Sequence, residues 1–237
     1  MTRLRMALLS LVAVLGAVLA APVTGLATSG PVTETGTIDG SNFIIEIPAD
    51  WNGTLALYSH GYRLPGSPMT PQDAGDQGTH DYLLANHYAL AGSSYSTNGW
   101  ALQQAFHDQI ALLDHFDHNY GTPRRTIAWG HSLGGMITAG LIQLNPDRFA
   151  GALPMCGVVA GGPAVWNQGL DAEFVFKTLA GPAAAGLQLV NITNPGNLGL
   201  AESVAAAEQA TPQGRAHLAL VAAVGDTPGW FDPASPE

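Results

Sequence analysis

The hydrophobic residues of this chain follow two alternating patterns between residues 53 and 160. Short continuous apolar runs, typical of buried β-strands, alternate with stretches in which apolar residues recur every three or four positions, typical of helices. The strand-like runs cover residues 53–62, 89–95, 124–130 and 149–160, and the helix-like stretches cover residues 80–88, 99–121 and 133–145. This alternation predicts an α/β fold with a mostly parallel sheet flanked by helices.

A β-hairpin and a helical segment are predicted on either side of this core. Two short strand-like runs within residues 32–48 flank Asp39-Gly40, a dipeptide that favours a tight hairpin turn. From about Gly161 onward the pattern is helical with no strand, so we predict a helical insertion after the last strand. The expected organisation is residues 1–20 as a signal peptide, 21–31 as a flexible lead-in, 32–160 as the core and 161–237 as the insertion.

The N-terminal residues predict export. Arg3 and Arg5 precede an apolar stretch from Met6 to Leu19, and small residues before Ala20 offer a cleavage site. A membrane anchor is the alternative, but the run is short for a span, so we expect no stable membrane insertion and a secreted protein cleaved near Ala20. The formal net charge of −10 argues against nucleic acid or an anionic membrane surface as a partner.

The segment "IAWGHSLGGM" has the pattern of a serine nucleophile on a sharp turn. Gly130-x-Ser132-x-Gly134, followed by Gly135, lies between a predicted strand and a predicted helix, the context that this motif requires. The alternative, a glycine-rich turn with Ser132 as a simple helix cap, explains the strand–turn–helix context less well. We therefore predict that Ser132 is a nucleophile.

An earlier strand end predicts the second half of an oxyanion hole. The run "LYSHGYR" ends in His60-Gly61-Tyr62, about 70 residues before the nucleophile. Two backbone N–H groups must converge on the developing oxyanion. We predict that the N–H of Leu133, directly after the nucleophile, and the N–H of Tyr62 supply them. His131 is interpreted as part of the turn and not as the base.

These motifs together resemble the α/β-hydrolase superfamily. The resemblance rests on "SHGY" after one strand, "GHSLGGM" after a later one and the helical segment after "GALPMC", and it is greatest for secreted actinobacterial esterase- or peptidase-like members. It implies a serine nucleophile, an acid and a histidine after later strands, and a lid formed by the insertion. It implies no cofactor, and the sequence predicts no metal site.

The acid and the base of such a triad have no clear counterpart in this chain. His217 is the one histidine after Ser132, and it lies in a predicted helix instead of after a strand. The candidate acids before His217 are Asp147, Asp171, Glu173 and Glu202. Because no strand-like run follows Gly161, we expect the sequence to be truncated at its C-terminus, so that the fold is incomplete.

The polar residues of the longest predicted helix do not predict a metal site. The predicted helix over 99–121 has an apolar stripe formed by Leu102, Phe106, Ile110, Leu113, Phe116 and Tyr120. Its histidines and aspartates (His107, His115, His118, Asp108, Asp114 and Asp117) fall off this stripe and predict a solvated polar face, not a metal pair. His80 and His87 flank a predicted helix and give no indication of a functional role.

Cys156 is either a small apolar residue of a buried strand or half of a disulfide with a partner outside this sequence.

The sequence thus favours a secreted serine hydrolase that acts on small-molecule carboxylic esters, or on amides. A serine peptidase with a peptide substrate is one alternative. An inactive fragment or a non-catalytic binding protein on a hydrolase scaffold is the other. Aromatic residues in the predicted lid (Trp166, Phe174, Phe176, Trp230 and Phe231) favour a substrate with an apolar part.

Overall fold

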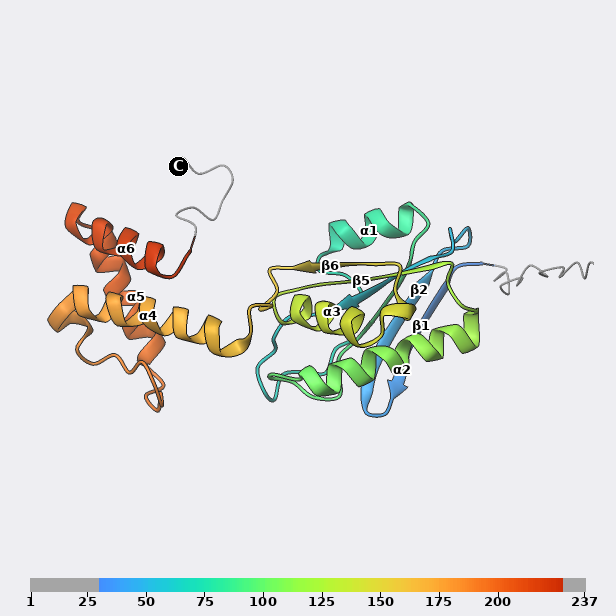
Figure 1. Cartoon of the computed structure of the whole chain (residues 1–237), viewed down its shortest axis with the longest axis horizontal. Coiled ribbons are helices and arrows are strands. Elements are labelled where there is room, and N and C mark those ends of the chain that lie inside the picture. Colours follow the sequence, from blue (N-terminus) through green and yellow to red (C-terminus); the bar gives the residue numbers. More distant parts are fainter. Residues whose placement is uncertain (1–29, 228–237) are drawn as a thin grey trace, which may run out of the picture.

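A six-stranded mixed sheet forms the centre of the structure, a computed structural model that describes residues 30–227 (Figure 1). The strands are β1 (Val32–Ile38), β2 (Ser41–Ile47), β3 (Thr54–Ser59), β4 (Ala89–Ser93), β5 (Arg125–His131) and β6 (Gly151–Met155), in the spatial order β1-β2-β4-β3-β5-β6. The neighbouring pairs among β4, β3, β5 and β6 are parallel, and β2 pairs antiparallel with β1 and β4. The predicted α/β class with helices around a largely parallel sheet is confirmed.

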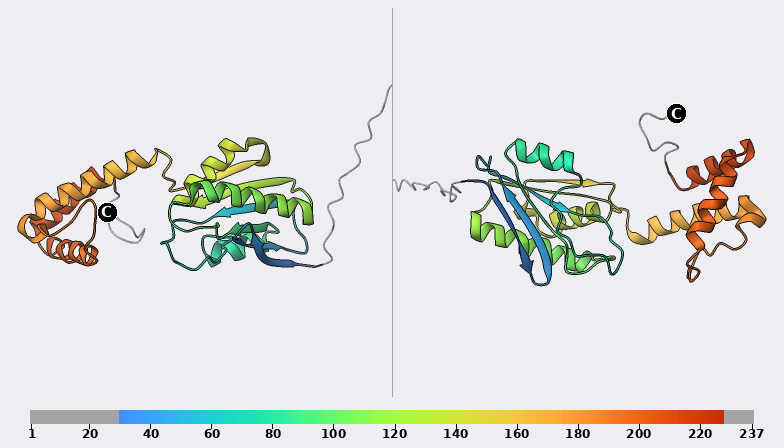
Figure 2. Two further views of the ribbon diagram at one scale, coloured as in Figure 1. Left: turned by 90° about the horizontal axis from the view of Figure 1, so that it is seen from below. Right: turned by 180° about the vertical axis from the view of Figure 1, so that it is seen from behind.

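Three helices cover the two faces of this sheet. They are α1 (Gln77–Ala85), α2 (Leu102–Tyr120) and α3 (Leu133–Leu144), and the short 3₁₀ helix η1 (Pro146–Arg148) follows α3. Two views show α2 and α3 on one face and α1 on the other (Figures 1 and 2). Side chains of β3 alternate accordingly: Leu55 and Leu57 pack with α2, whereas Ala56 and Tyr58 pack with partly buried leucines of α1.

The turn between β1 and β2 is short because its residues accept left-handed backbone angles. Asp39 and Gly40 have φ values of 49° and 85°, which the two-residue turn of a tight hairpin requires. The register runs from Val32 opposite Ile47 to Ile38 opposite Ser41. β2 then extends the sheet by pairing with β4.

The buried face of α2 differs from the predicted stripe. Of the six predicted residues only Leu113 and Phe116 are buried, and the face is completed by Ala105, Asp108, Gln109 and Leu112. Asp108 is 4% exposed and accepts a hydrogen bond from the Ser96 N–H at 2.7 Å, so its assignment to a solvated face was wrong. Gln109 donates to the Tyr58 carbonyl at 2.6 Å. Polar groups at the ends of β3 and β4 thus draw polar side chains of the helix inward.

His115 also departs from the solvated face that the spacing predicts. Its ring packs against Phe43 of β2, with centroids 5.0 Å apart, and its Nε2 lies 3.0 Å from Glu34 Oε1 on β1. The reason is that β1 and β2 extend the sheet over this part of α2. His107 and His118 are exposed, as expected.

The segment after β6 is helical. It contains α4 (Gly162–Ala180), the 3₁₀ helix η2 (Gly181–Ala184), α5 (Asn197–Gln209) and α6 (Pro212–Val224). Helix α4 leads away from the carboxyl ends of the parallel strands, and α6 packs on α4 and on α5, which also contacts η2 (Figures 1 and 2). Within residues 30–227 no helix is both long and apolar enough to cross a bilayer. The predicted signal peptide, Trp230 and Phe231 lie outside the described residues.

Candidate active site

Ser132 occupies the sharp turn between β5 and α3. Its backbone angles are φ 57° and ψ −124°, an unfavourable conformation for a residue with a side chain, and it is exposed. The Ser132 N–H donates to the carbonyl of Met155, the last residue of β6, at 3.0 Å. The strained backbone is therefore held by a hydrogen bond to the neighbouring strand, and the side chain is left facing solvent.

Small residues allow α3 to begin this close to the sheet. A Cβ on Gly134 would lie 2.6 Å from the carbonyl carbon of Ser59, and a Cβ on Gly135 would lie 2.5 Å from the carbonyl oxygen of Met155. A Cβ on Gly130 would lie 2.7 Å from the carbonyl oxygen of Gly134. Real Cβ atoms do not approach backbone so closely, so the turn needs glycine at all three positions.

Two backbone N–H groups, one next to Ser132 in the chain and one on the adjoining loop, are free to donate. Leu133 begins α3, and neither its N–H nor that of Tyr62 donates a hydrogen bond within residues 30–227. The loop that carries Tyr62 lies against the turn, because a Cβ on Gly61 would be 3.6 Å from Ser132 Cβ. Free N–H groups at a helix N-terminus and on an adjoining loop are the components of an oxyanion hole.

His60 holds the loop that carries Tyr62. Its side chain is 2% exposed, with Nδ1 2.7 Å from the Gly61 carbonyl oxygen and Nε2 3.1 Å from that of Ser94. The Tyr95 ring stacks on it at 4.0 Å, and the Tyr95 hydroxyl donates to the His60 carbonyl at 2.9 Å. Burial lowers the pKa of His60 to about 4, so the ring is neutral at pH 7. These contacts make it a positioning residue.

The sequence around this turn is similar to sequences of known hydrolases. Residues 91–161, which run from β4 through Ser132 to the start of α4, match the profile of the Prolyl oligopeptidase family. The chain is 26% identical over 224 residues to an o-phthalyl amidase of Xanthobacter agilis. Both matches agree with the resemblance to α/β-hydrolases that the sequence motifs indicate. The match covers 84% of this chain and 47% of the amidase, so the chain spans about half the length of that relative.

Two solved structures resemble this chain over part of its length. The proline iminopeptidase of Mycobacterium smegmatis is 15% identical with a TM-score of 0.45, and the similarity covers 82% of this chain and 68% of that one. A thermostable carboxyl esterase of Bacillus coagulans is 13% identical with a TM-score of 0.39, covering 53% of this chain and 44% of that one.

Within residues 30–227, no histidine or acid forms a hydrogen bond with the Ser132 side chain. Ser132 Oγ takes part in no hydrogen bond within residues 30–227. His217 lies on α6, where its Nδ1 is 2.8 Å from Glu208 Oε2, so it is paired within the helical segment. The four candidate acids are exposed and lie on η1, α4 and α5: Asp147, Asp171, Glu173 and Glu202.

His131 contacts a buried tyrosine instead of the nucleophile. The Tyr58 hydroxyl lies 2.6 Å from His131 Nδ1. Burial raises the pKa of Tyr58 to about 12, so its hydroxyl stays protonated while it is hydrogen-bonded to the imidazole. The contact ties the residue before Ser132 to β3, which agrees with a role of His131 in the turn.

Cys156 does not occupy a buried strand position, so that interpretation was wrong. It is exposed and lies directly after β6, with φ 48°. The chain turns there toward α4, and this turn takes the side chain out of the sheet.

Three exposed aromatic rings connect the site to the helical segment. The Tyr62 ring lies 5.7 Å from the Trp100 ring, which in turn lies 5.6 Å from the Trp166 ring of α4. The three rings are 43%, 46% and 61% exposed. This aromatic file (Tyr62, Trp100 and Trp166) begins directly after Gly61, which lies against Ser132, so it offers an apolar surface near Ser132.

Proposed function

We propose that the full-length protein is a secreted serine hydrolase that cleaves carboxylic esters of small molecules. Ser132 Oγ attacks the carbonyl carbon, and the N–H groups of Leu133 and Tyr62 hold the oxyanion. The observation that carries the proposal is the exposed, strained Ser132 with these two free N–H groups beside it. The general base and its acid are assigned to a segment outside residues 30–227, which agrees with the C-terminal position that the sequence order predicts.

The aromatic file supports a substrate with an apolar part. The rings of Tyr62, Trp100 and Trp166 are exposed to water, and covering them with an apolar group is favourable. We propose that the acyl or leaving group of the substrate lies on the file while its carbonyl reaches Ser132. Helix α4 then acts as one wall of the site, the role proposed for the insertion as a lid.

Amide hydrolysis is the second candidate. The matched profile belongs to a peptidase family, and the relative of similar sequence is named an amidase. Ester and amide chemistry share the nucleophile and the oxyanion hole, so the site geometry supports both. Paired aryl ester and aryl anilide substrates with the same acyl group separate the two, because amide cleavage also needs an acid that protonates the leaving amine.

A fluorophosphonate probe tests the proposed nucleophile. We expect the full-length protein to be labelled once, and Ser132→Ala to lose the label while keeping its circular dichroism spectrum. Ser203→Ala, which removes an exposed serine of α5, is the matched control and should keep the label. A folded full-length protein that never labels would instead support a non-catalytic binding role on this scaffold.

A further inference from the structure

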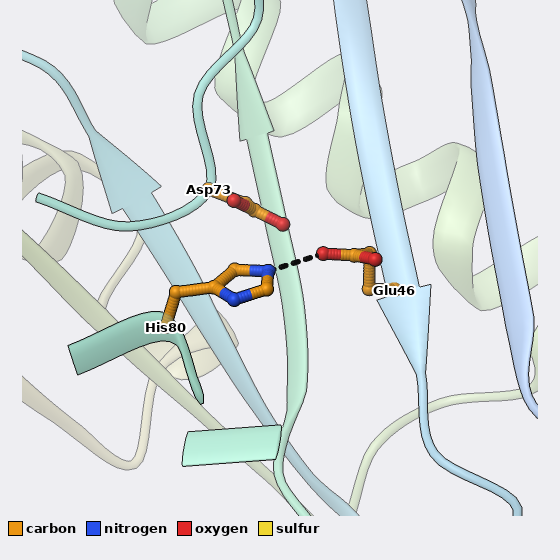
Figure 3. A group of neighbouring side chains, drawn as sticks. All are labelled: Glu46, Asp73 and His80. Atoms are coloured by element: carbon orange, nitrogen blue, oxygen red, sulfur yellow. Dashed lines mark hydrogen bonds and ion pairs between the residues drawn. The ribbon is translucent and has the colours of Figure 1, made fainter. Parts of the chain in front are cut away.

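A strand, a loop and a helix bring together three side chains that can bind a metal ion, none of them part of the turn around Ser132. Glu46 lies on β2, Asp73 on the loop before α1, and His80 on α1 (Figure 3). Each offers one ligand atom, and these atoms lie within 4.8 Å of one another. Carboxylate oxygens and an imidazole nitrogen at such spacing can close on one cation with small side-chain movements.

Asp73 is buried without a partner for one of its oxygens. The residue is 7% exposed, and its Oδ2 is buried and takes part in no hydrogen bond within the described residues. Figure 3 shows its carboxyl group pointing into the gap between Glu46 and His80. Its backbone is fixed there, because a Cβ on Gly92 of β4 would lie 2.9 Å from Asp73 Cα. Burying a carboxylate without a partner destabilises the fold, so a positive charge in the gap would be stabilising.

The neighbouring side chains supply too little positive charge. His80 Nε2 lies 2.5 Å from Glu46 Oε2, and the ion pairs of residues 30–227 give neither Glu46 nor Asp73 a lysine or an arginine. Asp81 adds a further carboxylate, with Oδ1 2.9 Å from His80 Nδ1. One histidine therefore faces three carboxylates. A shared proton can offset part of this excess, and a divalent cation offsets more of it.

The orientation of His80 is the one that metal-binding histidines adopt. Metal ligands of this kind generally place the second ring nitrogen against a carboxylate, which fixes the ring and its tautomer. Asp81 occupies that position at Nδ1, and the Gln77 amide lies 3.2 Å from the same atom. Nε2 is left to face Glu46 and Asp73, so the ring presents a nitrogen lone pair to the gap once its proton leaves.

We propose that Glu46, Asp73 and His80 bind a divalent metal ion, for which Zn²⁺ is the best match. An imidazole nitrogen with two carboxylate oxygens suits Zn²⁺ better than Ca²⁺ or Mg²⁺, which prefer oxygen ligands in larger number. The ion takes the place of the proton between His80 and Glu46, and that proton leaves to solvent. A surface cavity of about 220 Å³ provides access and room for water as the remaining ligand; it is lined by Pro71, Gln72, Asp73, Ala74, Asp76, Gln77 and His80.

The bound ion would fasten the loop before α1 to the sheet. This loop also reaches the back of the site, since a Cβ on Gly75 would lie 3.3 Å from the Tyr58 hydroxyl. The inferred role is therefore structural, and it does not depend on the hydrolase activity. Metal binding and thermal stability can be measured whether or not Ser132 proves to be a nucleophile.

Zinc titration of the untagged full-length protein tests the proposal. Isothermal titration calorimetry should show one saturable Zn²⁺ site with proton release, and a hundredfold excess of Zn²⁺ over Kd should raise Tm by about 5 °C or more. Glu46→Gln, Asp73→Asn and His80→Gln should each weaken binding by about tenfold or more, and Asp81→Asn by about tenfold. Ca²⁺ and Mg²⁺ should raise Tm by much less.

Two comparisons make the test decisive. His115→Gln removes a similar half-buried histidine–glutamate pair and should leave the Zn²⁺ affinity unchanged. Without metal, Asp73→Asn should melt no lower than the wild type, because it removes an uncompensated charge, and it should lose the Zn²⁺-dependent rise. Absence of saturable binding, or equal binding by Asp73→Asn, overturns the proposal and leaves a cluster that is neutralised by protons alone.

Discussion

The same substitution, Gly→Ala, should have opposite effects in two helices of this protein. At Gly134, near the start of α3, the added methyl group meets backbone on the strand side, at 2.6 Å from the Ser59 carbonyl carbon and 2.7 Å from the His60 carbonyl oxygen. Carbon atoms in ordinary contact lie about 3.5–4.0 Å apart, so the helix and β3 must separate by about 1 Å. Neither contact atom belongs to a side chain that could rotate away.

The expected cost of Gly134→Ala follows from this overlap. Overpacking of a core costs about 1–3 kcal/mol when side chains can adjust, and here only backbone can move, so we expect a loss of at least about 3 kcal/mol. Gly169 in α4 is exposed, and a Cβ there meets nothing within 4 Å. Gly169→Ala should therefore stabilise the protein by about 0.5–1 kcal/mol through helix propensity.

Urea unfolding followed by tryptophan fluorescence measures both effects. The midpoint should fall for Gly134→Ala and rise slightly for Gly169→Ala, with similar m values, because the exposed surface changes little. Fluorophosphonate labelling should fall strongly for Gly134→Ala and stay unchanged for Gly169→Ala. A Gly134→Ala protein within about 0.5 kcal/mol of the wild type would refute the claim that close backbone packing positions Ser132.

Three further outcomes follow from individual contacts. The free energy of unfolding should fall by up to about 3 kcal/mol as pH drops from 6.5 to 4, because the His60 pKa is near 6.5 in the unfolded chain and about 4 in the folded protein. Urea titrations across this pH range should show a shallower fall for His60→Gln. Asp108→Ala leaves the Ser96 N–H without its acceptor and should cost about 1–3 kcal/mol by the same assay; a neutral result would contradict the buried hydrogen bond. Trp100→Ala should raise KM for aryl esters about tenfold or more with little change in kcat, whereas Tyr82→Ala, an exposed aromatic residue of α1, should leave both constants unchanged.

The turn around Ser132 could be predicted from the sequence because its requirements are local. Glycine is needed where backbone approaches backbone, and Gly130, Gly134 and Gly135 stand within six residues of one another. Strands β3 and β4 are buried along their whole length, so their apolar runs are unbroken and easy to recognise. The order of the elements then gives the fold class without further information.

The polar partners could not be predicted because they come from distant segments. The acceptor of the Gln109 amide lies on β3, 51 residues earlier, and Glu34, which pairs with His115, lies 81 residues earlier. Helical periodicity sorts residues by hydrophobicity alone, so it placed Asp108 and His115 with the exposed side chains. The Glu46–Asp73–His80 cluster joins a strand, a loop and a helix, and no spacing in the sequence marks it.

The strand order explains why the strands on both sides of β5 matter for Ser132. β5 lies between β3 and β6, so the turn after it is bounded by the exits of both neighbours. The exit of β3 places Gly61 against Ser132, and the exit of β6 supplies the Met155 carbonyl that holds the Ser132 N–H. β6 carries no proposed reacting group, but its last carbonyl accepts the N–H of Ser132, whose φ is 57°. Ser132 thus lies at the ends of three neighbouring strands, and β6 contributes the carbonyl oxygen that holds its strained backbone.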